Sequence, residues 1–299
     1  MTKNVKCLAA GLLLSVALPV SVLAEKTVAP VVSQTAAVEG GRALHVVVAQ
    51  SEIKSDINPS NIVVATGGGL LGGLIGAAVD SARAKKAEEL IGPVRTATAD
   101  FDADALALET AKASFSDMEW YKANPVAAFG KDSSVAGKSA LLDAATGKQI
   151  AFVEYSYDLS PNFDAVRVVA KIEVANKAIP ASAKGKDEKR LNLKNLAYST
   201  RVTSVVLLKG AGEDKEVNAQ RWSVDNGAVT RRALQLAFAN LPTLTQRTLA
   251  QTADDIKALN DKKNKRINAG GFTGRPQQSP NAQTTLLWDG SFINIENLD

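Results

Sequence analysis

Cysteine and histidine are almost absent from this sequence, which has one of each, Cys7 and His45. Cys7 precedes the first long apolar run, so removal of that run as a leader would leave a chain without disulfides or thiolate chemistry. His45 lies in an apolar, strand-like stretch, with no second histidine or cysteine to build a common zinc site. It also has no recognisable nucleophile elbow to serve. We therefore interpret His45 as structural.

Aromatic residues are scarce too, at 5% of the chain, which argues against a surface that stacks nucleic-acid bases. The net charge of +4 falls to +2 if Lys3 and Lys6 leave with the leader, and so small a charge is weak evidence for an anionic partner. The glycines at 67–69 do not form a phosphate-binding loop, because no G-K-[ST] follows at the required spacing. We expect no nucleic-acid partner and no cofactor.

Acidic residues offer the remaining route to chemistry. Asp100, Asp102 and Asp104 alternate near an expected helix start, where the helix dipole favours acids. They lack the glycine and the distal glutamate of an EF-hand loop. A pair of acids far apart in the chain, as glycosidases use, stays open as an alternative. In the absence of a motif, we expect a protein that is not an enzyme, with no catalytic, cofactor-binding or metal-binding residues.

The N-terminus has the features of an export signal. Two lysines precede the apolar run Leu8–Val22, and small or compact residues fit a cleavage site after Ala24. Residues 1–24 are therefore predicted to be a signal peptide, and residues 25–41 a flexible linker. The cysteine precedes the apolar run, so it is not placed for lipid attachment. We expect a location in the periplasm or attached to the outer membrane, and not a lipoprotein.

The most unusual stretch is the uncharged run Ile62–Val79, which contains six glycines and passes into a charged helical pattern. Small residues recur in it at a spacing of four, which places them in two neighbouring stripes on a helix. Such stripes let another backbone approach closely, as in membrane helix pairs. The predicted helix-packing or membrane-contact site consists of Gly68, Gly72 and Gly76 in one stripe, and Gly69, Gly73 and Ala77 in the other.

Three interpretations of this run stay open. The first is that it enters or spans a bilayer, since its 18 residues would reach roughly 27 Å as a helix. The second is a helix packed tightly against a sheet or another copy of the chain. The third is a glycine-rich turn followed by an ordinary buried helix. Each glycine in a helix costs roughly 1 kcal/mol relative to alanine, so packing or lipid must compensate.

Two motifs in this part of the chain carry a family resemblance. A strand of the form VVxxQxxI covers Val46–Gln50 with Ile53, and a segment of the form GGGLxGxLIGxxVDxxRAKKAEE covers Gly67–Glu89. Both resemble an uncharacterised family of exported bacterial envelope proteins over roughly residues 44–107. The second segment is also similar to the glycine-zipper segments of bacterial outer-membrane surface antigens. The resemblance implies an envelope location and supplies no catalytic motif.

The rest of the chain predicts an α+β fold. Residues 43–50 form a continuous β-branched run, typical of a central strand buried on both faces. Alternating patterns at 149–159 and 163–175 predict a hairpin with Val168, Ala170, Ile172 and Val174 toward the core. Further strands are predicted at 191–208 and 217–224, completing an antiparallel meander. We expect a mostly antiparallel sheet, made of this meander and a C-terminal hairpin, with helices packed on one face.

Helices and loops complete the predicted organisation. One helix is expected over 67–91, ending at Gly92–Pro93, and another over 96–115. A third is expected over 229–241, capped by Asp225 or Asn226. Pro242 interrupts it, and a helix over 243–259 follows. Residues 116–148 read as a long irregular loop. The α+β domain spans 42–267, followed by a linker over 268–283. Asp289-Gly290 between two short apolar runs predicts a hairpin over 284–299.

The function that these features favour is a non-enzymatic cell-envelope protein. It would pack, oligomerise or contact a membrane through the glycine-rich helix, with a second copy or an envelope protein as partner. The alternative is a soluble periplasmic binding or accessory module in which that helix is buried in its own fold.

Overall fold

The computed structural model describes residues 31, 42–56, 70–116, 118, 123–145, 149–176, 196–259, 261, 267–269, 272–277, 283–287 and 290–298. For residues 42, 70–78, 123–128, 259, 267–269, 272–273 and 283–287 it describes the backbone alone. The predicted signal peptide, nearly all of the predicted 25–41 linker, and Gly68 and Gly69 lie outside these residues. Val31, from that linker, is partly buried against the main core.

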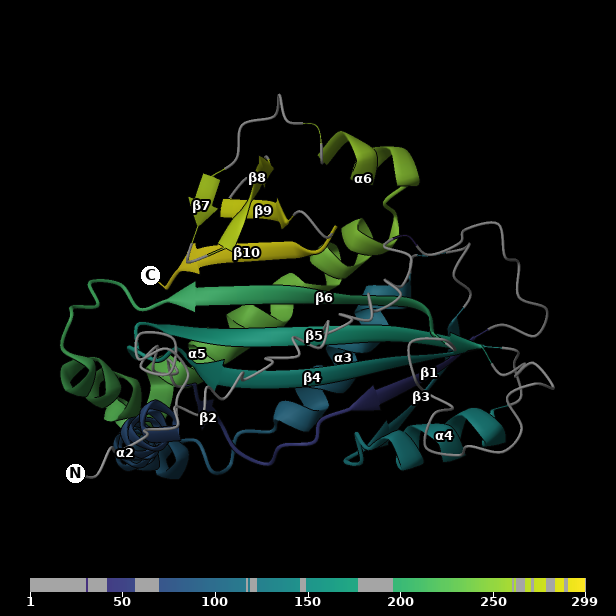
Figure 1. Ribbon diagram of the computed structural model, residues 1–299. Coiled ribbons are helices and arrows are strands. Elements are labelled where there is room, and N and C mark those ends of the chain that lie inside the picture. Colours follow the sequence, from purple (N-terminus) through teal and green to yellow (C-terminus); the bar gives the residue numbers. More distant parts are fainter. Residues whose placement is uncertain are drawn as a thin grey trace, which may run out of the picture.

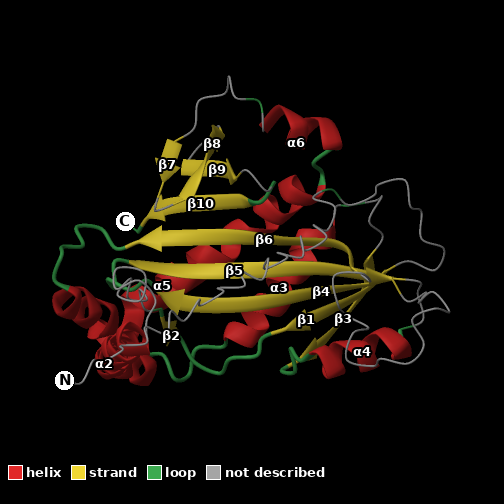
Figure 2. Ribbon diagram, in the orientation of Figure 1, coloured by secondary structure: helices red, strands yellow, loops and turns green. Residues whose placement is uncertain are grey.

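The described strands form one sheet, with helices on both sides (Figures 1 and 2). In spatial order they are β3 (Ala123–Gly130), β1 (Arg42–Val47), β4 (Gln149–Leu159), β5 (Ala165–Asn176), β6 (Leu196–Leu207), β10 (Phe292–Asn297), β9 (Gln283–Leu287), β8 (Phe272–Gln277) and β7 (Ile267–Ala269), while β2 (Lys54–Ser55) pairs with β4.

The sheet is mixed, which corrects the expected mostly antiparallel sheet in part. Strands β4, β5 and β6 form the predicted antiparallel meander. Strand β1, however, runs parallel to both β3 and β4, and β10 runs parallel to β6. Parallel neighbours need long crossover connections. Two helices separate β1 from β3 along the chain, and a third separates β3 from β4.

Helices α3 (Ala103–Ser116) and α5 (Lys215–Leu249) cover one face of the sheet, and α2 (Leu70–Ala97) packs against α5. Helix α4 (Val135–Ala144) lies on the opposite face, where Leu142 packs with Ile150 and Phe152. The prediction that all helices share one face is therefore wrong for α4. A short helix, α6 (Ala253–Leu259), follows α5.

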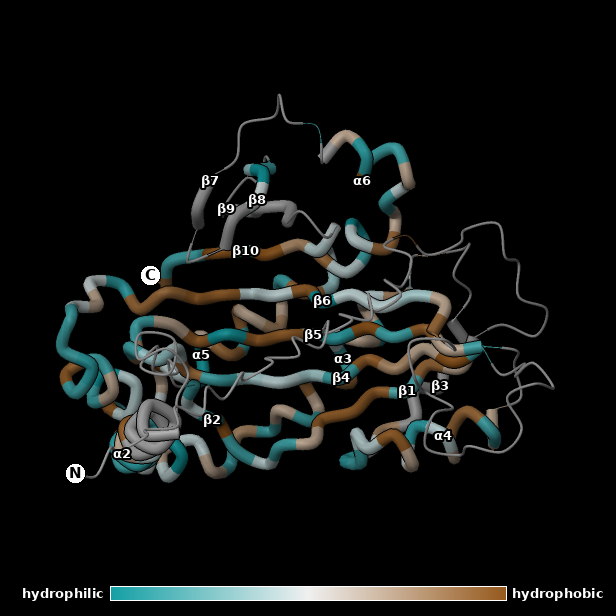
Figure 3. The backbone as a smooth tube through the Cα atoms, viewed as in Figure 1, coloured by the Kyte–Doolittle hydropathy of each residue, from teal (hydrophilic) through white to brown (hydrophobic). Residues whose placement is uncertain are grey.

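The main core lies between the central strands and α5. The predicted inward face of β5 is confirmed, since Val168, Ala170 and Ile172 are each 0% exposed. Trp222 is fully buried and donates from Nε1 to the carbonyl of Phe163 at 2.7 Å. Hydrophobic residues gather in these central strands (Figure 3). This core fixes α5, and α5 in turn fixes α2.

Residues 217–223 are helical, so the strand predicted over 217–224 is wrong. Helix α5 begins after Asp214, whose side chain accepts hydrogen bonds from the backbone N–H groups of Glu216 and Val217. The chain leaves the helical conformation from Val224 to Gly227, so α5 consists of two helical segments joined by a kink. The second segment agrees with the helix expected from residue 229. Asp225 and Asn226 lie in the left-handed turn before it and do not have the extended backbone of an N-cap. Pro242 lies within α5 without ending it. A large apolar residue such as Trp222 suggests a strand, but a helix can bury it equally well on the face that it turns to the core.

The predicted loop over 116–148 contains β3 and α4, and both have weak local patterns. Strand β3 includes Pro125 and three alanines, but it is the edge strand of the sheet, where proline is tolerated. Helix α4 is capped by Ser134, which accepts from Gly137 N–H. Tertiary packing overrides local propensity in both elements.

Two further boundaries differ from expectation. Helix α2 passes through Gly92 and Pro93 to Ala97, because Ile91 and Val94 on either side are both fully buried. The helix expected over 96–115 is thereby divided between α2 and α3. Residues 268–283, predicted as a linker, contain β8. Strands β9 and β10 pair as the hairpin expected after it, with Gly290 at φ +86°.

Candidate functional site

Four of the six predicted contact residues, Gly72, Gly73, Gly76 and Ala77, lie in the N-terminal half of α2. The helix is unbroken over its 28 residues, about 42 Å at 1.5 Å per residue. The glycine-rich and the charged parts of the sequence therefore belong to one continuous helix. Because the backbone is helical, the four-residue spacing keeps Gly72 and Gly76 on one face, and Gly73 and Ala77 on the next.

The C-terminal half of α2 is firmly docked. Ala87, Ile91 and Val94 are 8%, 0% and 0% exposed, at spacings of four and three that define one helix face. This face packs against α5 and the main core. We call residues 87–97 the docked half of α2.

Docking stops at Lys86. Its ammonium pairs with Glu216 of the first turn of α5 at 2.7 Å, and none of the side chains from Val79 to Lys86 is buried. We call residues 70–86 the projecting half, a name that rests on Val79–Lys86, the part of it whose side chains the structure describes. It measures about 25 Å along its axis, and its described side chains meet solvent or the edge of α5. Figure 1 shows α2 nearly end-on, beside the start of α5.

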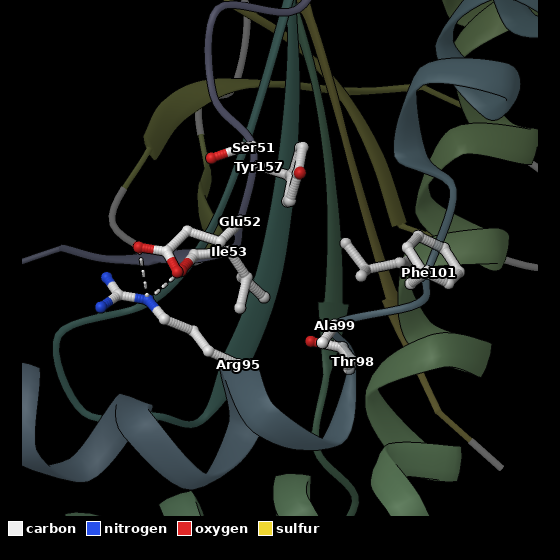
Figure 4. A pocket seen from close by; sticks show the side chains of 9 residues that line it. Ser51, Glu52, Ile53, Arg95, Thr98, Ala99, Phe101 and Tyr157 are labelled. Carbon is white, nitrogen blue, oxygen red and sulfur yellow. Dashed lines mark hydrogen bonds and ion pairs between the residues drawn. The ribbon is translucent and has the colours of Figure 1, made fainter.

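Arg95 fastens the docked half to the strand region. Its Nε donates to the carbonyl of Ile53 at 2.9 Å and lies 3.3 Å from Glu52 Oε1. Its terminal nitrogens pair with both oxygens of Glu88, about two turns of the helix away. One guanidinium therefore links α2 to the segment just before β2 (Figure 4).

A second arginine holds the end of α2. Arg231 of α5 donates to the carbonyl of Ala97 at 2.7 Å, to the carbonyl of Asn226 at 3.1 Å, and to the Asp100 carboxylate. Gly227, at φ +69°, lies so close that a Cβ there would come within 3.0 Å of Thr98 and 3.1 Å of the Ala97 carbonyl. The left-handed turn of α5 thus makes room for the end of α2.

A pocket of about 160 Å³ lies between these fastenings. Its apolar wall is formed by Ile53, Phe101 and Leu234, and its polar rim by Ser51, Glu52 and Arg95 (Figure 4). The other lining residues are Thr98, Ala99 and Tyr157. Burial raises the pKa of the Tyr157 hydroxyl, and the nearby Asp104 carboxylate adds to that rise.

Gln50 does not line this pocket but holds the backbone of Tyr157, which does. Its amide donates to the backbone carbonyl of Tyr157 at 2.7 Å and accepts from the Tyr157 N–H at 3.2 Å. Strands β1 and β2 both run parallel to β4. In the gap between them, the Gln50 side chain makes the hydrogen bonds to β4 that a strand backbone would otherwise make. The glutamine of the VVxxQxxI motif thus has a structural role, which its isolated polar position within an apolar run could have indicated.

The three alternating acids do not converge. Asp100 pairs with Arg231, Asp104 with Lys131 at 2.6 Å, and Asp102 accepts from the Ala105 N–H at the start of α3. Among the described residues, no group of three or more histidine, cysteine or acidic side chains is placed to hold a metal ion.

His45 lies on the sheet face opposite α5, buried edge-on against the Phe152 ring. Burial lowers its pKa, which keeps the imidazole neutral near pH 7. A buried neutral ring packed on an aromatic side chain fits the structural interpretation.

The same face carries a charged cluster that sequence reasoning missed. Lys138 of α4 is 6% exposed and reaches Glu154 at 3.1 Å and Glu173 at 2.9 Å. Burial opposes its charge, but the two carboxylates outweigh this and raise its pKa. These contacts anchor α4 to β4 and β5.

A second charged group lies further along these strands, where Arg167 pairs with Asp158 and Asp56. Burial raises the pKa of Asp158 to about 6, although Arg167 opposes the rise. Neither charged group has a signature in the sequence, because their members come from distant segments.

Comparisons with protein families, with curated proteins and with solved structures find no match. Within the described parts of the chain, no helix combines the length and the apolar character that crossing a membrane requires.

Proposed function

We propose that this protein is a non-enzymatic component of the cell envelope that associates with a helical partner through the glycine-rich face of α2. The contact residues are Gly72, Gly73, Gly76 and Ala77. The observation that supports this proposal is the division of α2, because one continuous helix is docked from Ala87 onward, whereas none of its described side chains before Ala87, from Val79 to Lys86, is buried.

The energetics of the projecting half favour a partner. Three glycines lie within residues 70–86, and each costs about 1 kcal/mol of helix stability relative to alanine. No buried face has been found in the described side chains of this half to offset that cost. A partner helix packed against the small residues would supply the missing contacts.

The alternative of a helix buried in its own fold has less support. It requires the glycine-rich residues to pack on this chain, whereas the helix passes from Lys86 to Val79 without a buried side chain. Association with a second copy or with an envelope protein does not require the glycine-rich residues to pack on this chain. The export signal at residues 1–24 is the basis for the envelope location.

Sedimentation velocity of the mature chain, residues 25–299, tests association. We expect the wild-type protein to form a complex that the double variant Gly72→Leu, Gly76→Leu does not form. Leucine favours a helix over glycine, so loss of the complex would reflect the lost smooth face and not an unfolded helix. The matched control, Ala82→Leu, alters an exposed position on another face of the same helix and should still associate.

Fractionation of cells tests whether the protein associates with a partner other than a second copy of itself. Wild-type protein should remain with the membrane fraction through a high-salt wash and leave in mild detergent, and the glycine double variant should appear in the soluble fraction. A wild-type protein that is monomeric when purified and also fully soluble in cells would overturn the proposal.

A further inference from the structure

The pocket at the end of α2 lies where ligands commonly bind beside parallel strands. Ser51, Glu52 and Ile53 follow the carboxyl end of β1, and Tyr157 lies near the carboxyl end of β4, to which β1 and β2 are both parallel. Loops at the carboxyl ends of parallel strands form binding crevices in many folds. From the character of this pocket we infer that it binds the primary ammonium end of a small organic cation, with the Glu52 carboxylate as counter-ion.

The size of the pocket limits the ligand. Its volume of about 160 Å³ is below the roughly 300–1,000 Å³ of sites that enclose whole drug-sized ligands. It therefore suits an end group, such as an ammonium on a short alkyl chain, and excludes a nucleotide or other large cofactor from full enclosure.

The charges at the rim favour a cation. Two carboxylates, from Glu52 at the rim and from Glu88 outside the pocket lining, face a single guanidinium, that of Arg95. The neighbouring cations Lys131 and Arg231 are each paired with an aspartate. An incoming anion would meet a surplus of negative charge, whereas an ammonium would neutralise it.

Glu52 is accessible for this role. Its side chain is 54% exposed, and its Oε1 contacts Arg95 Nε at 3.3 Å. Among the described residues, its Oε2 has no hydrogen-bond or ion-pair partner. Arg95 is held independently by Ile53 and by both oxygens of Glu88, so a ligand at Glu52 leaves that fastening in place.

The pocket walls suit the body of such a ligand. Ile53 and Leu234 are 2% and 1% exposed and provide an apolar floor. The rings of Tyr157 and Phe101 line the same space (Figure 4), and aromatic faces attract ammonium groups. An alkyl chain against the floor and an ammonium at the rim would use both surfaces.

The test is titration calorimetry of the mature protein with n-butylammonium, with n-butanol and butyrate as uncharged and anionic controls of the same length. We expect saturable binding of butylammonium alone. In Glu52→Gln, affinity should fall about tenfold, as expected for the loss of one charge-assisted hydrogen bond. The control Glu109→Gln removes an exposed acid of α3 outside the pocket and should bind as the wild type does.

A second variant guards against an indirect effect of Glu52→Gln. Ala99 is exposed at the pocket rim, so Ala99→Leu should narrow the entrance and weaken binding without disturbing the core. Absence of saturable butylammonium binding to the wild type would overturn the inference, as would equal binding of butanol. If butylammonium binding were weakened equally in Glu109→Gln, the effect of Glu52→Gln would reflect only the change in net charge, and the inference would also be overturned. These outcomes do not depend on association through the glycine-rich face.

Discussion

The docked and projecting halves of α2 belong to one helix but are stabilised differently. In the docked half, a glycine and a proline are accommodated because Ile91 and Val94 are fully buried and two arginines fasten the end. In the projecting half, three glycines lie on a stretch whose described side chains find no core. Tertiary packing, and not helix propensity, therefore stabilises the docked half as a helix. The projecting half needs packing from another molecule to be stabilised in the same way.

The largest expected difference between the halves comes from truncating apolar side chains. Ile91→Ala should lower the free energy of unfolding by about 3 kcal/mol, because it removes a fully buried side chain and leaves a cavity. Val79→Ala, in the projecting half, should lower it by less than about 1 kcal/mol. Urea denaturation of both variants measures the difference, and equal losses would mean that both halves are docked.

Loss of the Arg95 fastening should have the next largest effect. Arg95→Met leaves the Ile53 carbonyl without its donor and should lower the free energy of unfolding by about 1–2 kcal/mol. Arg83→Met removes an exposed arginine of the projecting half and serves as the control, with little change expected. A loss in Arg83→Met as large as that in Arg95→Met would contradict the distinction between the halves.

Glycine-to-alanine substitutions compare the two halves through stabilisation instead of destabilisation. Among the described residues, no atom outside the neighbouring backbone of α2 lies within 4 Å of a Cβ built on Gly92. Gly92→Ala should therefore stabilise the fold by up to about 1 kcal/mol through helix propensity. Gly72→Ala should increase helicity by circular dichroism but leave the unfolding midpoint of the monomer unchanged. A matching rise of the midpoint in Gly72→Ala would show that the projecting half unfolds together with the core.

The smallest expected effect marks the boundary between the halves. The hydrogen bond and charge of Glu216 raise the pKa of Lys86, but the pair is exposed to solvent, and such pairs contribute little. Lys86→Gln should shift the thermal midpoint only slightly, and less in high salt than in low salt. A large, salt-independent shift would place the limit of docking nearer the N-terminus than Lys86.

The parts of the fold that follow a simple period could be predicted from the sequence. Strand β4 has the predicted bounds, Gln149–Leu159, and β5 turns its predicted face inward. Strand β3 was missed because alanines and Pro125 carry little strand preference, and its position at the sheet edge is a property of the whole fold. The start of α5 was misread because Trp222 is buried through a contact with Phe163, which is distant in sequence.

The candidate site divides in the same way. The spacing of Gly72 and Gly76 is visible in the sequence, and α2 places them on a helix as expected. The pocket draws on four separate segments, represented by Glu52, Arg95, Tyr157 and Leu234. No local pattern indicates that these segments meet. Arg95 in particular reads as an ordinary charge near a helix end, and its fastening role depends on the approach of Ile53.

The most direct test of the central claim uses the absence of cysteine from residues 25–299. A thiol-reactive photo-crosslinker attached to the Ala77→Cys variant probes the glycine-rich face, and the same reagent on Ala82→Cys probes an exposed position on another face of the same helix. We predict a specific covalent adduct from Ala77→Cys, with a second copy or an envelope protein, and none from Ala82→Cys. No adduct from Ala77→Cys, or the same adducts from both variants, would contradict association through this face.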